Sequence, residues 1–433
     1  MVGNKRGGPL ESANVEEERR QPLAVICGAS ATGLGIARDL GRRGVPICFA
    51  DTKRHNPGLA SKYVSTEFPQ IIVSSSEELG RRLQELGRKL PAKAVLLQAS
   101  DEMVLAVAEH RAELEDYYWI AGSVNTADAL NFIDKKRFYE TCLRIGMATP
   151  KTAFPQDVGE AHRCAGEFTF PIILKPVVGH KKGKRLRGKK LLFIRSPKEF
   201  KEAVNQFADS LEGLILQEYI PGTESNIWFA GVYSDSSARV RQCFVGRKLR
   251  QYPPGCGIAS LAESARCPEV CRLTEELIER TGYRGICEPE FKYDERDGTF
   301  KIIEVNPRPM LWNALMSASG MDLNYYAYCD LAGLPLPECH KQHDGRRWLF
   351  AEKDVLTAVR YCLSGKLTPA AYFRSLRGVV VHPIVSRDDP SPMYRLLRHY
   401  AFRVLQQVGF GRTKTAEPPF SGISPDARKS ESS

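Results

Sequence analysis

The stretch from Leu23 to Asp51 limits the possible folds more than any other part of the sequence. An apolar run at residues 23–27 is typical of a buried strand, and a glycine-rich turn and a helical stretch follow it. A second apolar run at residues 45–50 ends at Asp51. This order predicts a strand–helix–strand unit. Because a further helical stretch and apolar run continue the pattern, we expect a Rossmann-like domain over residues 21–125.

The rest of the chain divides into four more segments by composition. At roughly 100–200 residues per domain, its 433 residues allow two to four domains. Residues 126–335 mix helical and strand-like stretches and predict a second, α+β domain, whereas residues 336–415 are helical and basic. Residues 1–20 and 416–433 are polar, and we expect both to be disordered tails.

Charge and cysteine content indicate the kind of ligand and the cellular compartment. Lys and Arg exceed Asp and Glu by 62 to 51, a net charge of +11, which favours anionic ligands such as nucleotides, phosphates and carboxylates. The 12 cysteines are scattered and form no CxxC pair, so we expect free thiols in a reducing compartment. Without a signal-like start or an apolar run of about 18 residues, the sequence predicts a cytoplasmic protein, with a homodimer as the default expectation.

The glycine-rich turn allows two interpretations. Gly28, Ser30, Gly33 and Gly35 open a helix after a strand, and Asp51 ends the next strand, where a ribose-binding acid of a dinucleotide site would lie. This pattern favours NAD or NADP. However, Ser30 replaces the glycine that lets a backbone approach a pyrophosphate. The alternative is a turn used for packing or for another small ligand.

A basic loop follows a strand in the second domain. The strand ends in Lys175-Pro176, and residues 180–190 contain seven Lys or Arg. Backbone N–H groups of such a loop can hold phosphate oxygens, and lysine charges offset those of the phosphates. The loop is not a Walker A motif, because Arg185 stands where Ser or Thr is needed. The alternatives are a solvated basic loop and a nucleic-acid patch.

Two carboxylates and an amide oxygen are expected to converge on a hairpin at residues 287–304. Glu290 and Glu304 lie on its two strands, and alternation places Asn306 on the face of Glu304. These are hard ligands of the kind that Mg²⁺ prefers, and carboxylates so close together need a cation. Arg308 follows and is suited to a phosphate or a carboxylate.

The order of these motifs resembles that of the ATP-grasp superfamily. The motifs are Asp134-Lys135, 174–176, 217–222, Glu290 and 304–308, and the resemblance covers roughly residues 21–330. Within the superfamily, the chain is similar to predicted carboxylate–amine ligases, the group near D-aspartate ligase. Residues 386–392 also resemble this group, but no chemistry follows from them.

The resemblance implies an α/β fold in three parts. These are a Rossmann-like N-terminal (pre-ATP-grasp) domain, a two-lobed α+β ATP-grasp domain over 126–335, and a helical C-terminal extension over 336–415. It also implies that ATP and Mg²⁺, or Mn²⁺, bind between the two lobes. The residues that the resemblance assigns to ATP are Lys135, Lys175, Gly179 and Lys182 for the phosphates, Gln217, Glu218 and Ile220 for adenine, and Glu224 for ribose. Residues 179–190 would close over the triphosphate as a mobile lid.

A third basic segment lies between the adenine residues and the hairpin. Arg247, Lys248 and Arg250 are candidates to stabilise the transferring phosphate or an acceptor carboxylate, with a surface turn as the alternative. Ser30 and Asp101 follow predicted strands of the first domain, so we expect them near the acceptor.

The function that the resemblance implies is an ADP-forming ligation. A carboxylate is activated as an acyl phosphate and joined to an amine, with an amino acid or peptide-like acceptor expected and a thiol acceptor still open. Two other classes compete: an NAD(P)-dependent oxidoreductase, and a basic protein that binds nucleic acid or a membrane surface. The latter rests on the net charge and on a stripe in the last helix, Leu396, Leu397, Tyr400, Val404 and Leu405. We expect that stripe to pack on the protein body, and we expect no nucleic-acid partner and no transmembrane segment.

Overall fold

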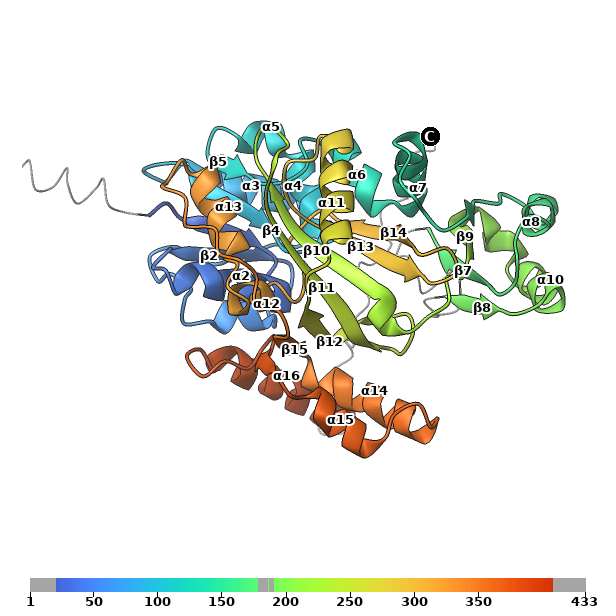
Figure 1. The fold of residues 1–433 in the computed structure, drawn as a ribbon. Helices are drawn as coiled ribbons and strands as arrows, with labels where there is room; N and C mark the ends of the chain where they lie inside the picture. Colours follow the sequence, from blue (N-terminus) through green and yellow to red (C-terminus); the bar gives the residue numbers. More distant parts are fainter. Residues whose placement is uncertain (1–20, 178–185, 187–190, 408–433) are drawn as a thin grey trace, which may run out of the picture.

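The computed structural model describes residues 21–177, 186 and 191–407 (Figure 1). Within these ranges the chain forms three β-sheets, each with its own buried apolar core. No helix in this part of the chain has both the length and the apolar character needed to cross a bilayer.

The first sheet has five parallel strands in the order β3-β2-β1-β4-β5. The strands are β1 (Ala24–Cys27), β2 (Ile47–Asp51), β3 (Ile71–Ile72), β4 (Ala94–Gln98) and β5 (Tyr118–Ile120). One face is covered by α3 (Ser76–Gly87), α4 (Asp101–Glu109) and α5 (Arg111–Leu114). The other is covered by α2 (Ala31–Gly41) and the 3₁₀ turn η1 (Pro57–Ala60). The Rossmann-like arrangement predicted from the first strand–helix–strand unit is confirmed.

The second sheet has seven strands in the order β14-β13-β10-β11-β12-β15-β16, antiparallel except for the last pair. The strands are β10 (Ile227–Ser234), β11 (Val240–Tyr252), β12 (Ile258–Ser264), β13 (Gly285–Asp294), β14 (Thr299–Asn306), β15 (Arg347–Leu349) and β16 (Val379–Val381). One face packs against α6 (Thr126–Ile133), α7 (Lys135–Arg144) and α11 (Pro268–Thr281).

The opposite face of this sheet packs against α12 (Ala314–Ala318) and α13 (Leu323–Leu331). Helix α13 is apolar on both sides: Tyr326 belongs to the core of the seven-stranded sheet, whereas Tyr328 and Cys329 belong to the core beneath α2. The first domain and the seven-stranded sheet are therefore joined through a shared buried helix.

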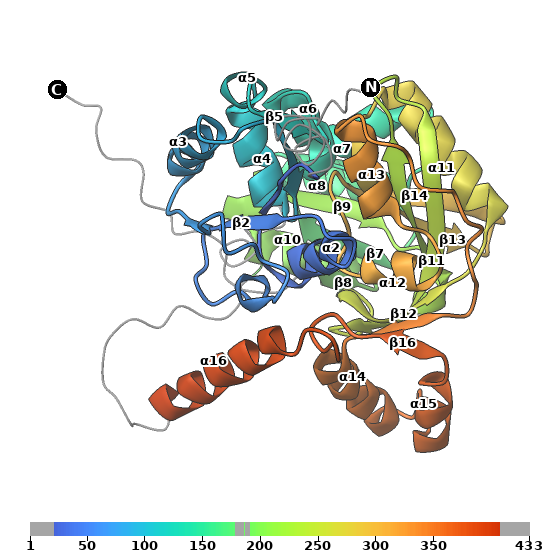
Figure 2. The same ribbon diagram turned by 90° about the vertical axis from the view of Figure 1, so that its left-hand side faces the viewer.

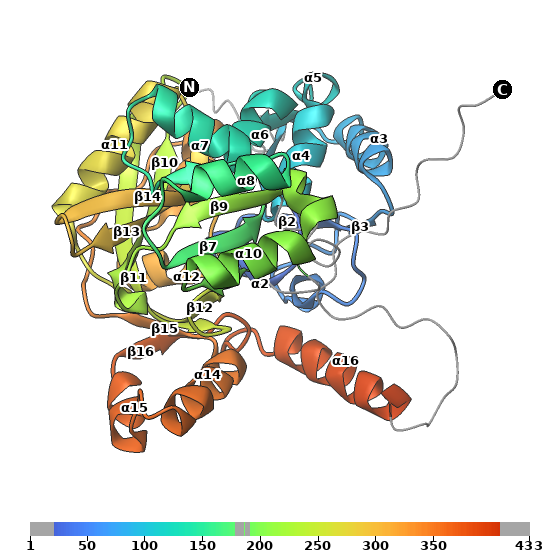
Figure 3. The same cartoon turned by 90° about the vertical axis from the view of Figure 1, so that its right-hand side faces the viewer.

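The third sheet is a separate four-stranded antiparallel sheet in the order β6-β9-β7-β8. Its elements are β6 (Thr152–Ala153), α8 (Val158–Ala165), β7 (Ile172–Pro176), β8 (Leu192–Ile194), α10 (Pro197–Gln206), η3 (Ala208–Gly213) and β9 (Leu214–Glu218), with η4 (Glu224–Asn226) leading back to β10. Figure 3 shows α8 and α10 lying over one face of this sheet. The two lobes implied by the sequence are the four-stranded and seven-stranded sheets.

The C-terminal extension is not purely helical. Besides α14 (Ala351–Leu363), α15 (Pro369–Ser375) and α16 (Ser391–Gln407), it supplies β15 and β16 to the edge of the seven-stranded sheet. Figure 2 shows the three helices along one side of the molecule. The strand pairing of β12 with β15 builds the extension into the second lobe.

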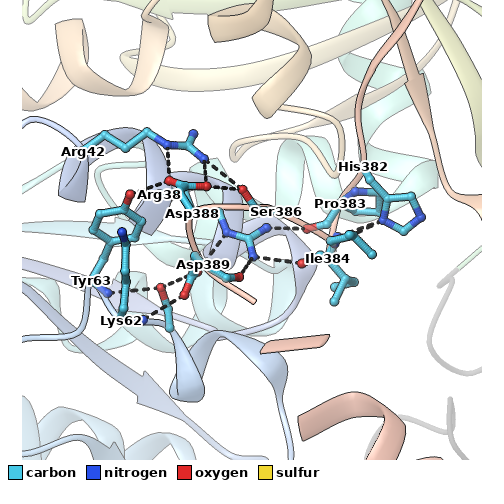
Figure 4. Close-up of polar contacts among 12 residues, drawn as sticks. Arg38, Arg42, Lys62, Tyr63, His382, Pro383, Ile384, Ser386, Asp388 and Asp389 are labelled. Atoms are coloured by element: carbon cyan, nitrogen blue, oxygen red, sulfur yellow. Dashed lines mark hydrogen bonds and ion pairs between the residues drawn. The ribbon is translucent and has the colours of Figure 1, made fainter. Parts of the chain in front are cut away.

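Residues 382–390, which we call the tether, fasten the extension to the first domain (Figure 4). The buried guanidinium of Arg38 on α2 lies 3.0 Å from the Asp389 carboxylate and also donates to two tether carbonyls at 2.8 Å. Asp389 accepts further hydrogen bonds from Ser61 Oγ at 2.8 Å and the Lys62 N–H at 2.9 Å. The tether thus spans from the seven-stranded sheet to α2 with all of these buried charges hydrogen-bonded.

Candidate active site

The β13–β14 hairpin gathers four polar side chains on one face. Glu290 pairs directly with Glu304, and Glu288 pairs with Asn306. Side chains that are opposite each other on paired strands share a face, and so do residues two apart on one strand. The predicted juxtaposition of Glu290, Glu304 and Asn306 is therefore present in the structure.

Lysines from two other elements meet these carboxylates. Lys248 on β11 is buried with its Nζ 2.6 Å from Glu290 Oε2, and Lys135 at the start of α7 lies 2.7 Å from Glu304 Oε1. The positive charge of Lys135 lowers the pKa of Glu304 to about 2. Asp134 positions Lys135 by capping α7, since its carboxylate accepts the N–H groups of the first turn.

Lys175 approaches the same point from the four-stranded sheet. Its Nζ donates to Gln217 Oε1 at 2.8 Å and to the Tyr139 hydroxyl at 3.3 Å. In the described ranges it has no carboxylate partner within ion-pair distance. Burial, and then the nearby charge of Lys135, lower the pKa of Lys175 to about 7. The small sheet thus presents a poorly compensated lysine to the hairpin cluster.

Glu288 is a member of the cluster that was not predicted. Its Oε2 accepts a 3.3 Å hydrogen bond from Asn306, but its Oε1 is buried without any hydrogen-bond partner in the described part of the chain. Burial, and then the charge of Glu290, raise the pKa of this carboxyl well above its usual range. The alternation that assigned Glu290 to this face also assigns Glu288, so the signal was available in the sequence.

Arg308 links the hairpin to the first domain. Its Nε lies 2.6 Å from Asp101 Oδ1, and a terminal nitrogen donates to Asn306 Oδ1 at 3.1 Å. Asp101 begins α4, directly after β4, at the carboxyl edge of the parallel sheet, where open α/β sheets bind ligands. The structure therefore brings Asp101 to the cluster, whereas Ser30 occupies the N-cap position of α2 without a side-chain hydrogen bond to the helix.

Two of the three basic residues predicted around position 248 do not join the cluster. Arg247 pairs across the sheet with Trp228, one position away from the row that holds Glu290, so its side chain lies on the opposite face, 3.0 Å from Glu263. Arg250 is buried in a two-pronged pair with Asp354 of α14, at 2.9 and 2.7 Å. The structure thus places Arg247 and Arg250 away from the cluster, in ion pairs with other carboxylates.

Of the residues predicted for adenine and ribose, two end β9 and two follow it, and three of the four have protein partners. Gln217 holds Lys175 and also donates to Thr152 Oγ1 at 2.8 Å. Glu218 accepts from Arg296 and from the Lys151 N–H.

Further along the chain, Ile220 is buried. Glu224 accepts from the Gly255 N–H and the Tyr361 hydroxyl, both at 2.7 Å. Burial raises the pKa of Glu224. Gly179 and Lys182 lie outside the described residues, as does the rest of the predicted lid apart from Leu186.

The glycine-rich turn is used for packing. A side chain at Gly33 would place its Cβ 1.9 Å from the Gly28 carbonyl, and one at Gly35 would place it 2.3 Å from Asn313 Oδ1. The buried Asp51 accepts the Ala29 N–H at 2.5 Å and the Asn56 amide at 2.7 Å, so its carboxylate is occupied locally. These contacts remove the support for a dinucleotide site at this turn.

The oxygen ligands of the hairpin suit a hard cation, although in this structure two of them are paired with lysines. In the ranges that the structure covers, no three His, Cys, Asp or Glu side chains are grouped as metal ligands. Glu290 and Glu304 face Lys248 and Lys135 instead, while the free Glu288 Oε1 leaves one buried acceptor unsatisfied. A carboxylate pair, an amide oxygen and a spare acceptor match the oxygen ligands of Mg²⁺.

A separate pocket of about 320 Å³ lies between the end of β5 and the carboxyl ends of α7 and α11. Its walls include Arg144, Arg280 and Arg284. None of the predicted site residues lines it.

Comparison with known proteins supports the fold. No family model matches the sequence. The D-aspartate ligase of Enterococcus faecium (strain Aus0004) is 24% identical over 323 residues, which cover 71% of this chain and 76% of that protein.

Solved structures agree with this likeness. The ADP complex of an N5-carboxyaminoimidazole ribonucleotide synthetase matches 79% of this chain and 86% of its own, with a TM-score of 0.60 at 16% identity. The L-amino acid ligase of Bacillus licheniformis matches 72% of this chain and 74% of its own, with a TM-score of 0.53 at 15% identity. The chain shares the fold of these enzymes.

Proposed function

We propose that this chain, which has the ATP-grasp fold, is an ATP-dependent carboxylate–amine ligase. The observation that carries the proposal is the cluster in which Lys135, Lys175, Lys248 and Arg308 surround the carboxylates of the β13–β14 hairpin. In this cluster, positively charged side chains alternate with oxygen ligands where the two lobes meet. Such an arrangement suits a triphosphate and its metal ion. It supplies no nucleophile. The names of the relatives support the same class, since they are a D-aspartate ligase and an L-amino acid ligase.

The proposed reaction has two steps. The substrate carboxylate attacks the γ-phosphorus of ATP, the bond to the β,γ-bridging oxygen breaks, and an acyl phosphate and ADP form. An amine then attacks the acyl carbon, phosphate leaves, and the amine nitrogen loses a proton as the amide forms. Phosphoryl transfer depends mainly on positioning and charge stabilisation rather than on covalent catalysis.

We assign the phosphates to Lys135 and Lys175, and the acyl phosphate or the acceptor carboxylate to Lys248 and Arg308. Lys175 is suited to an incoming anion because it lacks a carboxylate partner, and phosphate charge would restore its usual protonation. Arg308 presents a guanidinium beside the first domain, where the acceptor is expected. Gln217, Glu218, Ile220 and Glu224 remain predictions for the nucleoside.

Glu290, Glu304 and Asn306 would hold Mg²⁺, with Mn²⁺ as an alternative. When bound, the ion neutralises charge on the phosphate oxygens and orients them for transfer. The fit rests on the donor set and on the unsatisfied Glu288 oxygen beside it.

The experiment that tests the function is a thermal shift with the full chain. Mg²⁺ with a non-hydrolysable ATP analogue is compared with Mg²⁺ alone and with NADH. Ligand at about 100 times its dissociation constant adds roughly 2.7 kcal/mol to the free energy of unfolding. We expect only the Mg-nucleotide to raise the melting temperature, after which ADP release is screened over pairs of amino acids and amines. A shift with NADH alone would contradict the proposal.

Amino acids are the first substrates to test, because both ligases, the D-aspartate ligase and the L-amino acid ligase, are named for them. We also propose a cytoplasmic location, since all 12 cysteines are free thiols. A homodimer stays a prediction.

A further inference from the structure

Helix α14 has its polar side facing the protein. Asp354 receives the two-pronged bond from Arg250, the Thr357 hydroxyl donates to the Gln251 carbonyl at 2.8 Å, and Tyr361 bonds to Glu224. In an ordinary surface helix the apolar side packs inward and the polar side faces water. The polarity of α14 is the reverse, because its inward contacts are ion pairs and hydrogen bonds.

The outward side of α14 is consequently apolar. Leu356, Val359 and Leu363 repeat at three- and four-residue spacing, and Leu363 is 85% exposed. No packing contact within the described residues explains this stripe, since the helix is fixed by the opposite side. Such a surface indicates a partner rather than a core.

Helix α16 has the same arrangement at the other end of the extension. His399 stacks on His55 next to η1 at 4.4 Å between ring centroids, which fixes the inward side. Tyr394 and Leu397 are exposed on the other side. The prediction that the stripe of α16 packs on the protein body is therefore wrong for Leu397 and Tyr400.

These exposed apolar side chains are concentrated in one segment of the chain. Of the fifteen large hydrophobic side chains that are strongly exposed in the described ranges, eleven lie between residues 355 and 402. The helices α14, α15 and α16 lie on the same side of the body in Figure 1, Figure 2 and Figure 3. We call six of the exposed side chains on these helices the C-terminal apolar face: Leu356, Val359, Leu363, Phe373, Tyr394 and Leu397.

The charges around this face select the partner. Six exposed basic residues belong to the same segment, namely Arg360, Lys366, Arg374, Arg377, Arg387 and Arg398. The exposed acids described between residues 351 and 407 are Glu352 and Asp388, and Asp388 is paired with Arg42 at 2.9 Å. A second copy meeting this face would bring like charges together, which is unfavourable. Nucleic acid would satisfy the charges but not the apolar side chains.

We propose that the C-terminal apolar face docks on an anionic lipid surface. Helices with apolar and aromatic residues on one side and Arg or Lys along their flanks bind in the interfacial layer of anionic bilayers. The inward polar contacts of α14 leave its apolar side free to do this without disturbing the fold. This docking is separate from catalysis and does not rest on the proposed ligase activity.

The test is sedimentation of the full chain with vesicles, without any substrate. Vesicles of phosphatidylcholine alone are compared with vesicles that contain one quarter phosphatidylglycerol, at low and high salt. We expect binding to the anionic vesicles that falls with salt, because each Lys or Arg near the surface contributes about fivefold to partitioning. The double variant Arg374→Glu, Arg398→Glu should bind at least tenfold more weakly.

A matched pair of double variants tests the contribution of the apolar side chains to vesicle binding. Leu363→Asp with Leu397→Asp removes two exposed leucines of the face, whereas Leu143→Asp with Leu336→Asp makes the same change at exposed leucines elsewhere. We expect only the first pair to abolish vesicle binding, with unchanged melting temperatures. No binding of the wild-type chain to anionic vesicles, or equal binding of both pairs, overturns the proposal. So does a wild-type dimer in analytical ultracentrifugation that Leu363→Asp with Leu397→Asp dissociates, without vesicle binding.

Discussion

The tether and the β13–β14 hairpin both contain close ion pairs, but their surroundings differ. At the tether, Arg38 and Asp389 share their hydrogen bonds with α2, the turn after η1 and tether carbonyls. At the hairpin, Glu288 keeps an unsatisfied oxygen and Lys175 has no carboxylate partner among the described residues. Buried charges with a full set of partners hold a structure, whereas an incomplete set marks where a ligand is expected.

Arg250 belongs with the first kind. Its guanidinium is satisfied by Asp354 and Ser375, as that of Arg38 is by the tether. The comparison of the tether with the hairpin therefore distinguishes basic residues that stabilise the fold from those expected to bind ligand. The distinction follows from their partners and not from their position along the chain.

The largest effect is expected where a hairpin partner is removed. Lys175→Ala and Glu304→Gln should lower ADP formation by about 10³-fold or more, because each removes a charge that the phosphates or the metal require. Arg247→Ala, on the other face of the sheet, is the control and should keep near-normal turnover. ADP release with a working substrate pair measures this. Near-normal turnover of Lys175→Ala or Glu304→Gln would remove the hairpin from the active site.

Removing a tether partner should affect stability instead. Asp389→Ala leaves the Arg38 charge buried and unpaired, which costs about 3–5 kcal/mol. Asp388→Ala, which breaks a half-exposed pair with Arg42, should cost at most about 1 kcal/mol. Thermal melting measures both changes. If Asp389→Ala alters the KM for ATP at temperatures well below melting, the tether also affects nucleotide binding and does not act on stability alone.

The pH dependence of nucleotide binding should report Lys175. With a pKa of about 7, this lysine is protonated below pH 7 and mostly neutral above it. Phosphate favours the protonated form, so ATP affinity should fall by up to about tenfold for each pH unit above 7, with uptake of a proton. Calorimetry in buffers of different ionisation enthalpy measures this uptake. Lys175→Gln should bind more weakly at pH 6 and lose the dependence; an unchanged profile in that variant would assign it to another group.

The change expected at Glu288 is modest, and its sign is informative. The raised pKa means that the unfolded chain releases this proton more readily, so Glu288 destabilises the fold increasingly as pH rises above about 4.5. Glu288→Gln should therefore raise stability at pH 7, by about 1–3 kcal/mol, while ADP formation falls. Thermal melting at pH 5 and pH 7 tests this. A loss of stability at pH 7 would make Glu288 a structural residue like Asp389.

The sequence predicted the parts of the fold whose signal is local. The first strand–helix–strand unit and the pairing of Glu290 with Glu304 follow from runs and alternation within a few tens of residues. Contacts between distant elements could not be predicted in this way. Arg250 pairs with Asp354, and Gly35 packs against Asn313, and both of these neighbours come from much later in the chain. The surface turn that the sequence allowed around Lys248 and Arg250 is instead part of the strand β11, because these residues are buried by partners from distant elements.

The tether has a consequence for how the chain is made. Residue 38 leaves the ribosome long before residue 389, to which it is bonded across 351 positions, and the Tyr328 hydroxyl bonds back to the Pro22 carbonyl. During synthesis the α2 face of the first sheet therefore stays uncovered until segments more than 280 residues further along the chain have been translated. Contacts of such long range form late and leave apolar surface open to association in the meantime. The first sheet is therefore completed only after much of the later chain has been made.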